Sequence, residues 1–260
     1  MRLSPLLFEK RKALPPVLGG RGWGMESKTG LRYAGSILAI APSMEIPMVT
    51  VPLPDAHPIS FTEFLAWKPE NFPYELHHGI PIAMQPTGDH EEVIAFLNAV
   101  LLVEVQRRQQ PLILPKQALI KLPEEDTAYL PDIALVNRPA LSQEPLWKKA
   151  STITQGSSVP LVIEVVSTNW RVDYGKKLVD YEALGIVEYW IVDYLGLGGR
   201  RYIGNPKRPT LSIYTLVDDE YQVNQFRGPE VIQSVLFPEL AIAAETILQA
   251  GKMQSLYDGR

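Results

Sequence analysis

The stretch that decides the fold is a nearly continuous apolar run, Leu161-Val162-Ile163-Glu164-Val165-Val166. β-Branched residues dominate this run, which is typical of a strand that is buried on both faces. The one exception is Glu164, in its middle. Because an isolated buried carboxylate loses its hydration at a cost of several kcal/mol, we expect a cationic side chain, backbone donors or a metal ion to compensate for its charge.

The residues that follow this strand predict a helix and more strands. Over residues 170–185, apolar side chains recur at helical spacing and Gly185 is a plausible terminator, so we predict a helix. Residues 186–192 are predicted to form another strand, ended by Asp193. Residues 200–203, 211–216 and 221–225 indicate an antiparallel meander, and residues 241–248 a final apolar helix.

The residues that precede the central strand complete the pattern. Ser60 and Glu63 have capping-box spacing before a short amphipathic helix, and residues 74–85 predict a hairpin around Gly79. Residues 89–109 give the longest helix, followed by short strands over residues 112–114, 118–122 and 133–136. We therefore predict a mixed α/β (α+β) fold, with a central mixed sheet flanked by helices and a C-terminal antiparallel meander.

The chain divides into a globular domain and two flanking segments. Its 260 residues are 46% hydrophobic and 21% charged, which is ordinary globular usage. Residues 1–55 are rich in glycine and proline without a regular period, so we expect a disordered extension. The domain is assigned to residues 56–250, and residues 251–260 are expected to be a tail.

Composition excludes several classes of protein. The chain has no cysteine, which removes disulfides, thiolate zinc sites, iron–sulfur clusters and a cysteine nucleophile. A net charge of -4 argues against coating nucleic acid by bulk electrostatics, so any such contact is expected to be local. No phosphate-cradling glycine motif is present, and we expect no organic cofactor. No apolar run is long enough to span a membrane, and we expect a cytoplasmic protein.

A second acidic residue lies at the start of an apolar strand. Asp132 follows Pro131 and precedes Ile133, so it poses the same problem of burial as Glu164. Taken alone, either acid is more often structural, at a strand end or holding a loop. Taken together on neighbouring strands, the two acids favour a metal site, and an oxygen-rich set suits Mg²⁺ or Mn²⁺.

Other residues have two interpretations each. Lys177 lies one helical turn after Asp173 and one before Tyr181, and it either reaches back over Glu164 or forms a surface ion pair with Asp173. Glu75 is either the solvent face of a hairpin or a third metal ligand. His90 either lies beside the acids or caps and lines the long helix.

These motifs together resemble a known family. They are Tyr74-Glu75-Leu76-x-x-Gly79, His90 at the start of a helix, Pro131-Asp132-Ile133, the run around Glu164, Asp173-x-x-x-Lys177-x-x-x-Tyr181-x-x-x-Gly185, and Glu188-Tyr189-Trp190-Ile191-Val192-Asp193. In order and spacing, residues 61–248 resemble the Uma-type restriction endonuclease family, which is abundant in cyanobacteria. Two positions depart from the expected patterns. Val166 occupies the lysine position of the wider PD-(D/E)XK nucleases, although an apolar residue is usual there in this family, and the common proline after Ser167 is missing.

The resemblance implies a PD-(D/E)XK nuclease-like core and metal-dependent hydrolysis of DNA. It implies that Glu75, Asp132 and Glu164 hold Mg²⁺ or Mn²⁺ and that Lys177 is the displaced catalytic lysine. His90, Asp173 and Tyr181 are candidate accessory residues. The alternatives are a catalytically inactive nuclease fold that binds nucleic acid or a protein partner, and a structural or homodimeric module.

Local cations are the candidates for contacts with phosphate, although each one also fits an ordinary solvated charge. They are Arg107, Arg108, Lys148, Lys149, Arg171 and Lys176.

Overall fold

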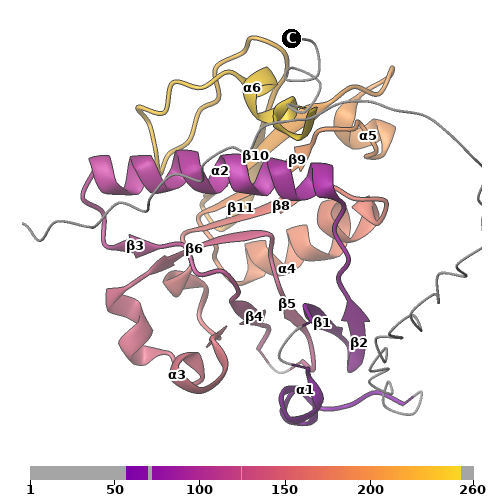
Figure 1. Ribbon diagram of the computed structural model, residues 1–260, viewed down its shortest axis with the longest axis vertical. Coiled ribbons are helices and arrows are strands. Elements are labelled where there is room, and N and C mark those ends of the chain that lie inside the picture. The colour runs from indigo at the N-terminus through magenta and orange to yellow at the C-terminus, as the bar shows by residue number, and fades with distance from the viewer. Residues whose placement is uncertain (1–56, 70–71, 124, 253–260) are drawn as a thin grey trace, which may run out of the picture. The chain divides into compact units, whose positions relative to one another are not determined.

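In the computed structural model, which describes residues 57–69, 72–123 and 125–252, the apolar run around Glu164 forms strand β8 (Leu161–Val165). All five of its residues are buried, as the sequence predicts. The extension predicted over residues 1–55 lies outside the described residues. Figure 1 shows β8 within a sheet that helices flank on both faces. The mixed α/β fold class is therefore confirmed.

β8 is a central strand of a six-stranded mixed sheet. Its parallel neighbour on one side is β9, and its antiparallel neighbour on the other side is β6. From one edge to the other, the strands are β11 (Glu220–Phe226), β10 (Thr210–Val217), β9 (Glu188–Asp193), β8, β6 (Ile133–Asn137) and β3 (Leu112–Ile113).

A second sheet holds the shorter strands, so the prediction of one central sheet is incomplete. In order, its strands are β2 (Ile80–Ala83), β1 (Tyr74–His77), β5 (Ala128–Tyr129), β4 (Leu119–Lys121) and β7 (Thr152–Ile153). The hairpin around Gly79 forms as predicted, with positive φ at His78 and Gly79. β5 and β7 have two residues each, which is too short for a recognisable period in the sequence.

The helices largely follow the sequence. Ser60 and Glu63 form the capping box of the first helix, and Thr87 caps the longest one. The α-helices are α1 (Phe61–Trp67), α2 (Gly88–Arg107), α3 (Trp147–Ala150), α4 (Leu178–Ala183), α5 (Arg200–Ile203) and α6 (Ala244–Leu248). The other helical segments are the 3₁₀ turns η1 (Pro139–Gln143), η2 (Gly156–Ser158) and η4 (Ala250–Lys252), and the π-helix η3 (Val172–Lys177). Residues 251 and 252, predicted as the start of a tail, belong to η4.

One predicted strand is wrong. Residues 200–203 form the helix α5, and the meander consists of β9, β10 and β11 instead. In this segment two exposed arginines come first and the buried Ile203 comes last. The polar and apolar residues are grouped in one turn and do not alternate, which removes the period-2 pattern of a half-buried strand.

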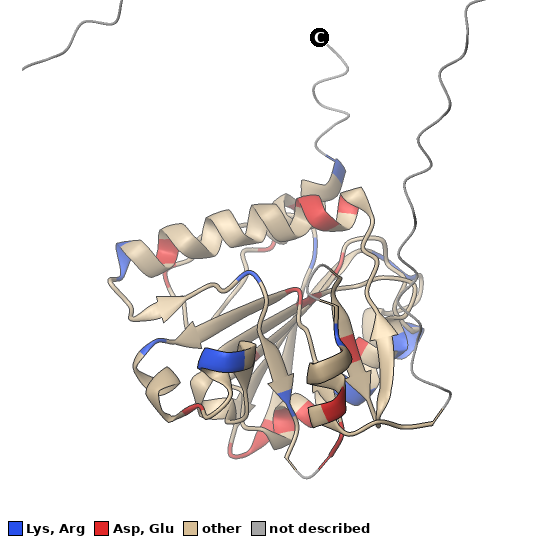
Figure 2. Cartoon of the chain, turned by 60° about the horizontal axis from the view of Figure 1, so that its bottom comes forward, with Lys and Arg blue, Asp and Glu red and all other residues tan. Residues whose placement is uncertain are grey.

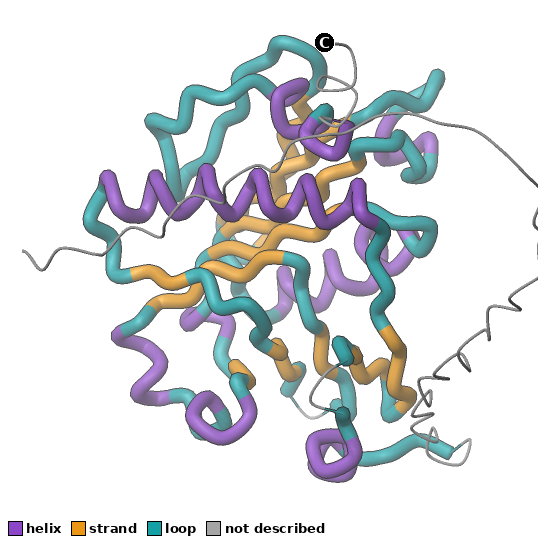
Figure 3. The backbone as a smooth tube through the Cα atoms, in the orientation of Figure 1, coloured by secondary structure: helices purple, strands orange, loops and turns teal. Residues whose placement is uncertain are grey.

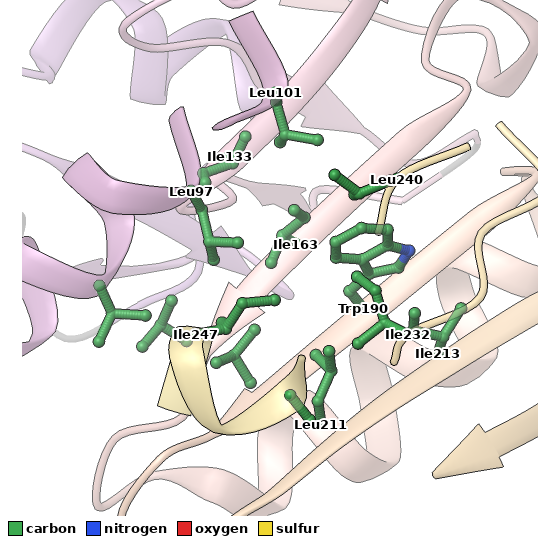
Figure 4. Close-up of a cluster of buried hydrophobic side chains, with 14 of the residues drawn as sticks. Leu97, Leu101, Ile133, Ile163, Trp190, Leu211, Ile213, Ile232, Leu240 and Ile247 are labelled. Atoms are coloured by element: carbon green, nitrogen blue, oxygen red, sulfur yellow. The ribbon is translucent and has the colours of Figure 1, made fainter. Parts of the chain in front are cut away.

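The two faces of the six-stranded sheet pack against different helices. On one face, α2 crosses the strands and α6 lies close to α2, as Figure 3 shows. Leu97 and Leu101 of α2 lie over Ile133 and Ile163 of the sheet in the core drawn in Figure 4. The opposite face carries Val162 and Val166, and it is covered by aromatic side chains of η3 and α4. This second face is the one to which Glu164 belongs, because alternate residues of a strand share a face.

Candidate active site

Lys177 lies at the centre of a buried group of acids. Its Nζ atom is 2.9 Å from Oε1 of Glu75, 2.9 Å from Oε1 of Glu164 and 3.8 Å from Oδ1 of Asp173. The ion pair with Asp173 therefore exists, but the side chain of Lys177 is only 2% exposed, so it is not a surface pair. Tyr181 donates a hydrogen bond from its hydroxyl to the same Glu164 oxygen at 3.0 Å.

The helix that carries Lys177 begins irregularly. The sequence predicts one continuous helix over residues 170–185, whereas its first part is the π-helix η3 and only its second part is α-helical. Gly185 follows with φ 75°, as expected of a terminator. A π-helical turn shifts the directions of the side chains after it, and such turns occur frequently at functional sites. In this chain the turn contains Asp173 and ends at Lys177.

Glu75 is brought to this group by the second sheet. Its residue is 2% exposed, so the solvent-facing interpretation is wrong. Oε1 accepts a hydrogen bond from the Leu130 amide at 3.0 Å, and Oε2 is 2.7 Å from Nε2 of His77. His77 was not among the predicted site residues. The signal that could have found it is strand alternation, because residues 75 and 77 share one face of β1.

Asp132 and His90 lie beside the end of β8. Oδ2 of Asp132 accepts a hydrogen bond from the Val165 amide at 2.7 Å, which fixes the carboxylate to the strand that carries Glu164. Nε2 of His90 is 2.8 Å from the Val165 carbonyl oxygen and 3.4 Å from Asp132 Oδ2. His90 thus lies beside the acids, in the first turn of α2.

The charges in this group do not balance around one lysine. Burial alone raises the pKa of Glu75, but Lys177 and His77 outweigh it and hold that pKa at about 2. Burial raises the pKa of Glu164 well above its usual range, and it raises that of Asp173 to about 6, with Lys177 opposing only in part. Burial lowers the pKa of Lys177, but the surrounding carboxylates more than reverse this. Lys177 is therefore a cation, and Glu75 is the acid that it most clearly neutralises.

The same group borders a cavity of about 780 Å³. Glu75, His90, Asp132, Asp173 and Lys177 all line it, whereas Glu164 is not among the described residues of its lining. Apolar side chains form much of the rest, and they include Ile82, Met84, Ile94, Leu102 and Leu114. The volume falls in the range of ligand-binding clefts. Glu75, Asp132, Asp173 and Lys177 therefore border a space that a ligand can enter, whereas Glu164 lies behind them.

A divalent cation fits this site by donor chemistry and by charge. Carboxylate oxygens suit Mg²⁺ and Mn²⁺. Three acids, Glu75, Glu164 and Asp173, lie within 4.0 Å of one lysine, and Asp132 lines the same cavity, so the site holds more carboxyl groups than Lys177 alone can neutralise. The ligands are not preassembled, however. Within residues 57–69, 72–123 and 125–252, no three His, Asp or Glu side chains are grouped closely enough to hold a metal ion, and Lys177 lies between Glu75 and Glu164.

Comparison with known proteins identifies the family. Residues 61–245 match Uma2, a family described as "Putative restriction endonuclease". The chain belongs to this family. Among solved structures, this chain is similar to a protein from Anabaena variabilis ATCC 29413 described as "a putative nuclease belonging to DUF820", with a TM-score of 0.57 and 17% sequence identity. The similarity covers 75% of this chain and 99% of that one, and at this identity it shows a shared fold.

A comparison with the curated proteins found no match to this chain. In the part of the chain that the structure describes, no helix has both the length and the apolar character needed to cross a lipid bilayer.

Proposed function

We propose that this chain is an endonuclease that hydrolyses DNA phosphodiester bonds with the help of Mg²⁺ or Mn²⁺. The observation that carries the proposal is the position of Lys177, buried between Glu75 and Glu164 and next to Asp173, at the edge of a cavity that Asp132 also lines. Membership of a family described as "Putative restriction endonuclease" supports cleavage of DNA.

The charges of the site support the proposal of a metal. Glu164 and Asp173 have raised pKa values because burial and the neighbouring carboxylates disfavour their charged forms. A divalent cation would relieve the same repulsion that a bound proton relieves. Asp132, Glu164 and Glu75 would hold it. Bound there, it would supply Lewis-acid chemistry, by polarising the scissile phosphate and lowering the pKa of a water molecule.

The protein's own residues have distinct tasks in this reaction. The Lys177 ammonium would stabilise negative charge that develops on the phosphate, as a fixed cation in a site of low dielectric. The Val165 amide holds Asp132 in place, and the Tyr181 hydroxyl holds Glu164. His90 is positioned by the Val165 carbonyl beside Asp132, where it restricts the movement of that carboxylate.

One observation favours a second function. Lys177 already pairs with one oxygen of Glu75 and one of Glu164, so the two acids have a compensating cation without any metal. A nuclease fold that no longer cleaves and binds nucleic acid or a protein would retain this arrangement for stability alone. Direct measurement of metal binding and cleavage distinguishes the two functions.

The test is a calorimetric titration of Mn²⁺ into the wild-type protein and into Glu164→Ala. The fold is expected to persist in the variant, because Lys177 keeps Glu75 as its partner. Glu245→Ala is the matched control, since Glu245 is exposed on α6. We expect binding in the wild type and the control and none in Glu164→Ala.

Cleavage is then followed on supercoiled plasmid with Mg²⁺, where Glu164→Ala should lose at least about 10²-fold in rate. Equal metal binding by all three proteins would contradict the assignment of the site. No binding and no cleavage by the wild type would favour the second function.

A further inference from the structure

A group of cations and aromatic rings lies next to the candidate active site and takes no part in it. We call it the basic aromatic surface. Its rings are Trp170 and Tyr202, both half-buried, and its cations are all exposed: Arg171, Arg200, Arg201, Lys207 and Arg208. Residues 194–217, which contribute four of these five cations, contain no aspartate or glutamate. A local excess of positive charge therefore exists in a chain whose net charge is -4.

The aromatic rings hold several of these cations in place. The Arg171 guanidinium lies 4.6 Å from the centre of the Trp170 ring, and Nζ of Lys207 approaches the same ring at 5.8 Å. The Arg201 guanidinium lies 4.4 Å from the centre of the Tyr202 ring. The two rings are themselves 6.3 Å apart. A cation held over a ring keeps its full charge, whereas one held by a carboxylate is neutralised.

The contrast with other cations of the chain is clear. Arg107 forms ion pairs with Glu104 and Glu239, and Lys176 pairs with Asp180, so these two candidates for phosphate contacts are already compensated. In the described ranges, the five cations of the basic aromatic surface form no ion pair within 4.0 Å. Figure 2 shows the positions of lysine and arginine in blue and of aspartate and glutamate in red over the fold. Among the described residues, the basic aromatic surface is thus a patch of cations without a carboxylate within 4.0 Å, and Lys207 is attracted from farther away by Asp193.

This surface adjoins the cavity. Ser167 and Asn169 line the cavity directly before Trp170 and Arg171, and Val172 and Asp173 line it directly after them. Tyr174, in the same π-helix as Lys177, stacks on Tyr202 of α5 with ring centres 4.8 Å apart. The cavity itself is rich in acids, so a polyanion needs attraction from outside it. The exposed cations are placed to supply that attraction at the rim.

We propose that the basic aromatic surface binds the phosphate backbone of the DNA that flanks the scissile bond. The inference rests on the proposed nuclease function and adds the surface that positions its substrate. Such contacts carry no sequence information, but they set the register of a strand on a protein. Here they would guide one phosphate toward Lys177 and Asp132. Charge complementarity selects this occupant, because a backbone of phosphodiesters matches a group of exposed cations that have no close carboxylate partners among the described residues.

The test measures binding of a fluorescein-labelled DNA duplex by anisotropy, with the full chain and EDTA so that metal-dependent cleavage does not occur. The surface variant carries Arg171→Gln, Arg201→Gln and Arg208→Gln. The comparison variant removes the same charge from other exposed cations, with Arg138→Gln, Lys148→Gln and Lys149→Gln at η1 and α3, and so also tests Lys148 and Lys149 as the competing candidates for phosphate contacts. Figure 1 shows α3 and α5 far apart in the fold. Circular dichroism checks that both variants are folded.

We expect the surface variant to bind at least about tenfold more weakly in 100 mM NaCl, while the comparison variant stays near the wild type. Each lost phosphate contact reduces the magnitude of the negative slope of log K against log [NaCl] by about 0.9, so the slope of the surface variant should be less steep by about 2 to 3. Equal weakening in both variants would overturn the proposal, because net charge alone would then explain binding.

The outcomes separate this inference from the function on which it rests. If the wild type binds duplex DNA through the surface but does not cleave it with Mg²⁺, the nuclease function fails and the surface stands. If the wild type cleaves plasmid and the surface variant binds and cleaves equally well, the surface fails and the function stands. Retained DNA binding by the surface variant, together with lost binding of a polyglutamate peptide, would assign the surface to an acidic protein and overturn the proposal.

Discussion

Replacing Lys177 by methionine would test the central ion pairs of the site. Methionine is unbranched and of similar length, but it carries no charge. The change leaves Glu75 and Glu164 buried without the cation that lies 2.9 Å from each. Removing one member of a buried pair costs about 3–5 kcal/mol, because the remaining charge stays uncompensated. We therefore expect Lys177→Met to lower the free energy of unfolding by about 3–5 kcal/mol at pH 7.

The cost should depend on pH in a definite direction. In the wild type, the pKa of Glu75 falls from 4.5 to about 2, so its stabilising effect is present above about pH 4.5 and is lost as the pH falls toward 2. In Lys177→Met the main cause of that lowering is gone, and the pKa of Glu75 rises. A carboxyl group whose pKa is raised by folding stabilises the folded state in acid, and this stabilisation is lost as the pH increases. The difference between the two proteins should therefore be larger at pH 7 than at pH 4.

Lys176→Met is the matched control, since Lys176 is the adjacent lysine and pairs with Asp180 at 3.3 Å on a partly exposed surface. An exposed pair of this kind contributes about 0.3–0.5 kcal/mol. Urea unfolding followed by tryptophan fluorescence at pH 4 and pH 7 measures both variants. Equal losses of stability in the two variants, or a loss in Lys177→Met that does not change with pH, would refute the reasoning.

Two further predictions concern the packing around the sheets. Ser234→Ala removes a 2.7 Å hydrogen bond to Glu188, whose pKa is raised by burial although its hydrogen bonds lower it. The free energy of unfolding should fall by about 1.5–3 kcal/mol at pH 8 and by less at pH 4, because the hydrogen bond is strongest to the charged carboxylate. Urea unfolding measures this at both pH values, and equal losses of stability would count against the prediction. Gly156→Ala would place a Cβ atom in steric conflict with the Leu184 carbonyl oxygen, whereas the Cβ atom of Gly88→Ala meets nothing within 4 Å. We expect Gly156→Ala to lower the free energy of unfolding by about 1–3 kcal/mol and Gly88→Ala to leave it unchanged. Thermal unfolding compares the two variants, and equal melting temperatures would contradict the predicted clash.

Local pattern was sufficient for much of the fold. The apolar run of β8, the helical period of α2 and the glycines at residues 79 and 185 each act within a few neighbouring residues, so the sequence predicts them directly. The prediction failed where the local signal was short or ambiguous. α5 is a single turn, and β5 and β7 have two residues each.

By itself, the sequence determined which charged residues lie within apolar runs. Such residues need a compensating charge or hydrogen-bond donor when they are buried. Glu164 and Asp132 were predicted for that reason, and their strands are neighbours in the sheet. The sequence left open whether Lys177 pairs with Asp173 at the surface or reaches Glu164, and whether Glu75 faces solvent. Only the tertiary structure decided these points. The partners lie on different sheets and helices, and burial, which gives an ion pair its energy, depends on the packing of the whole domain.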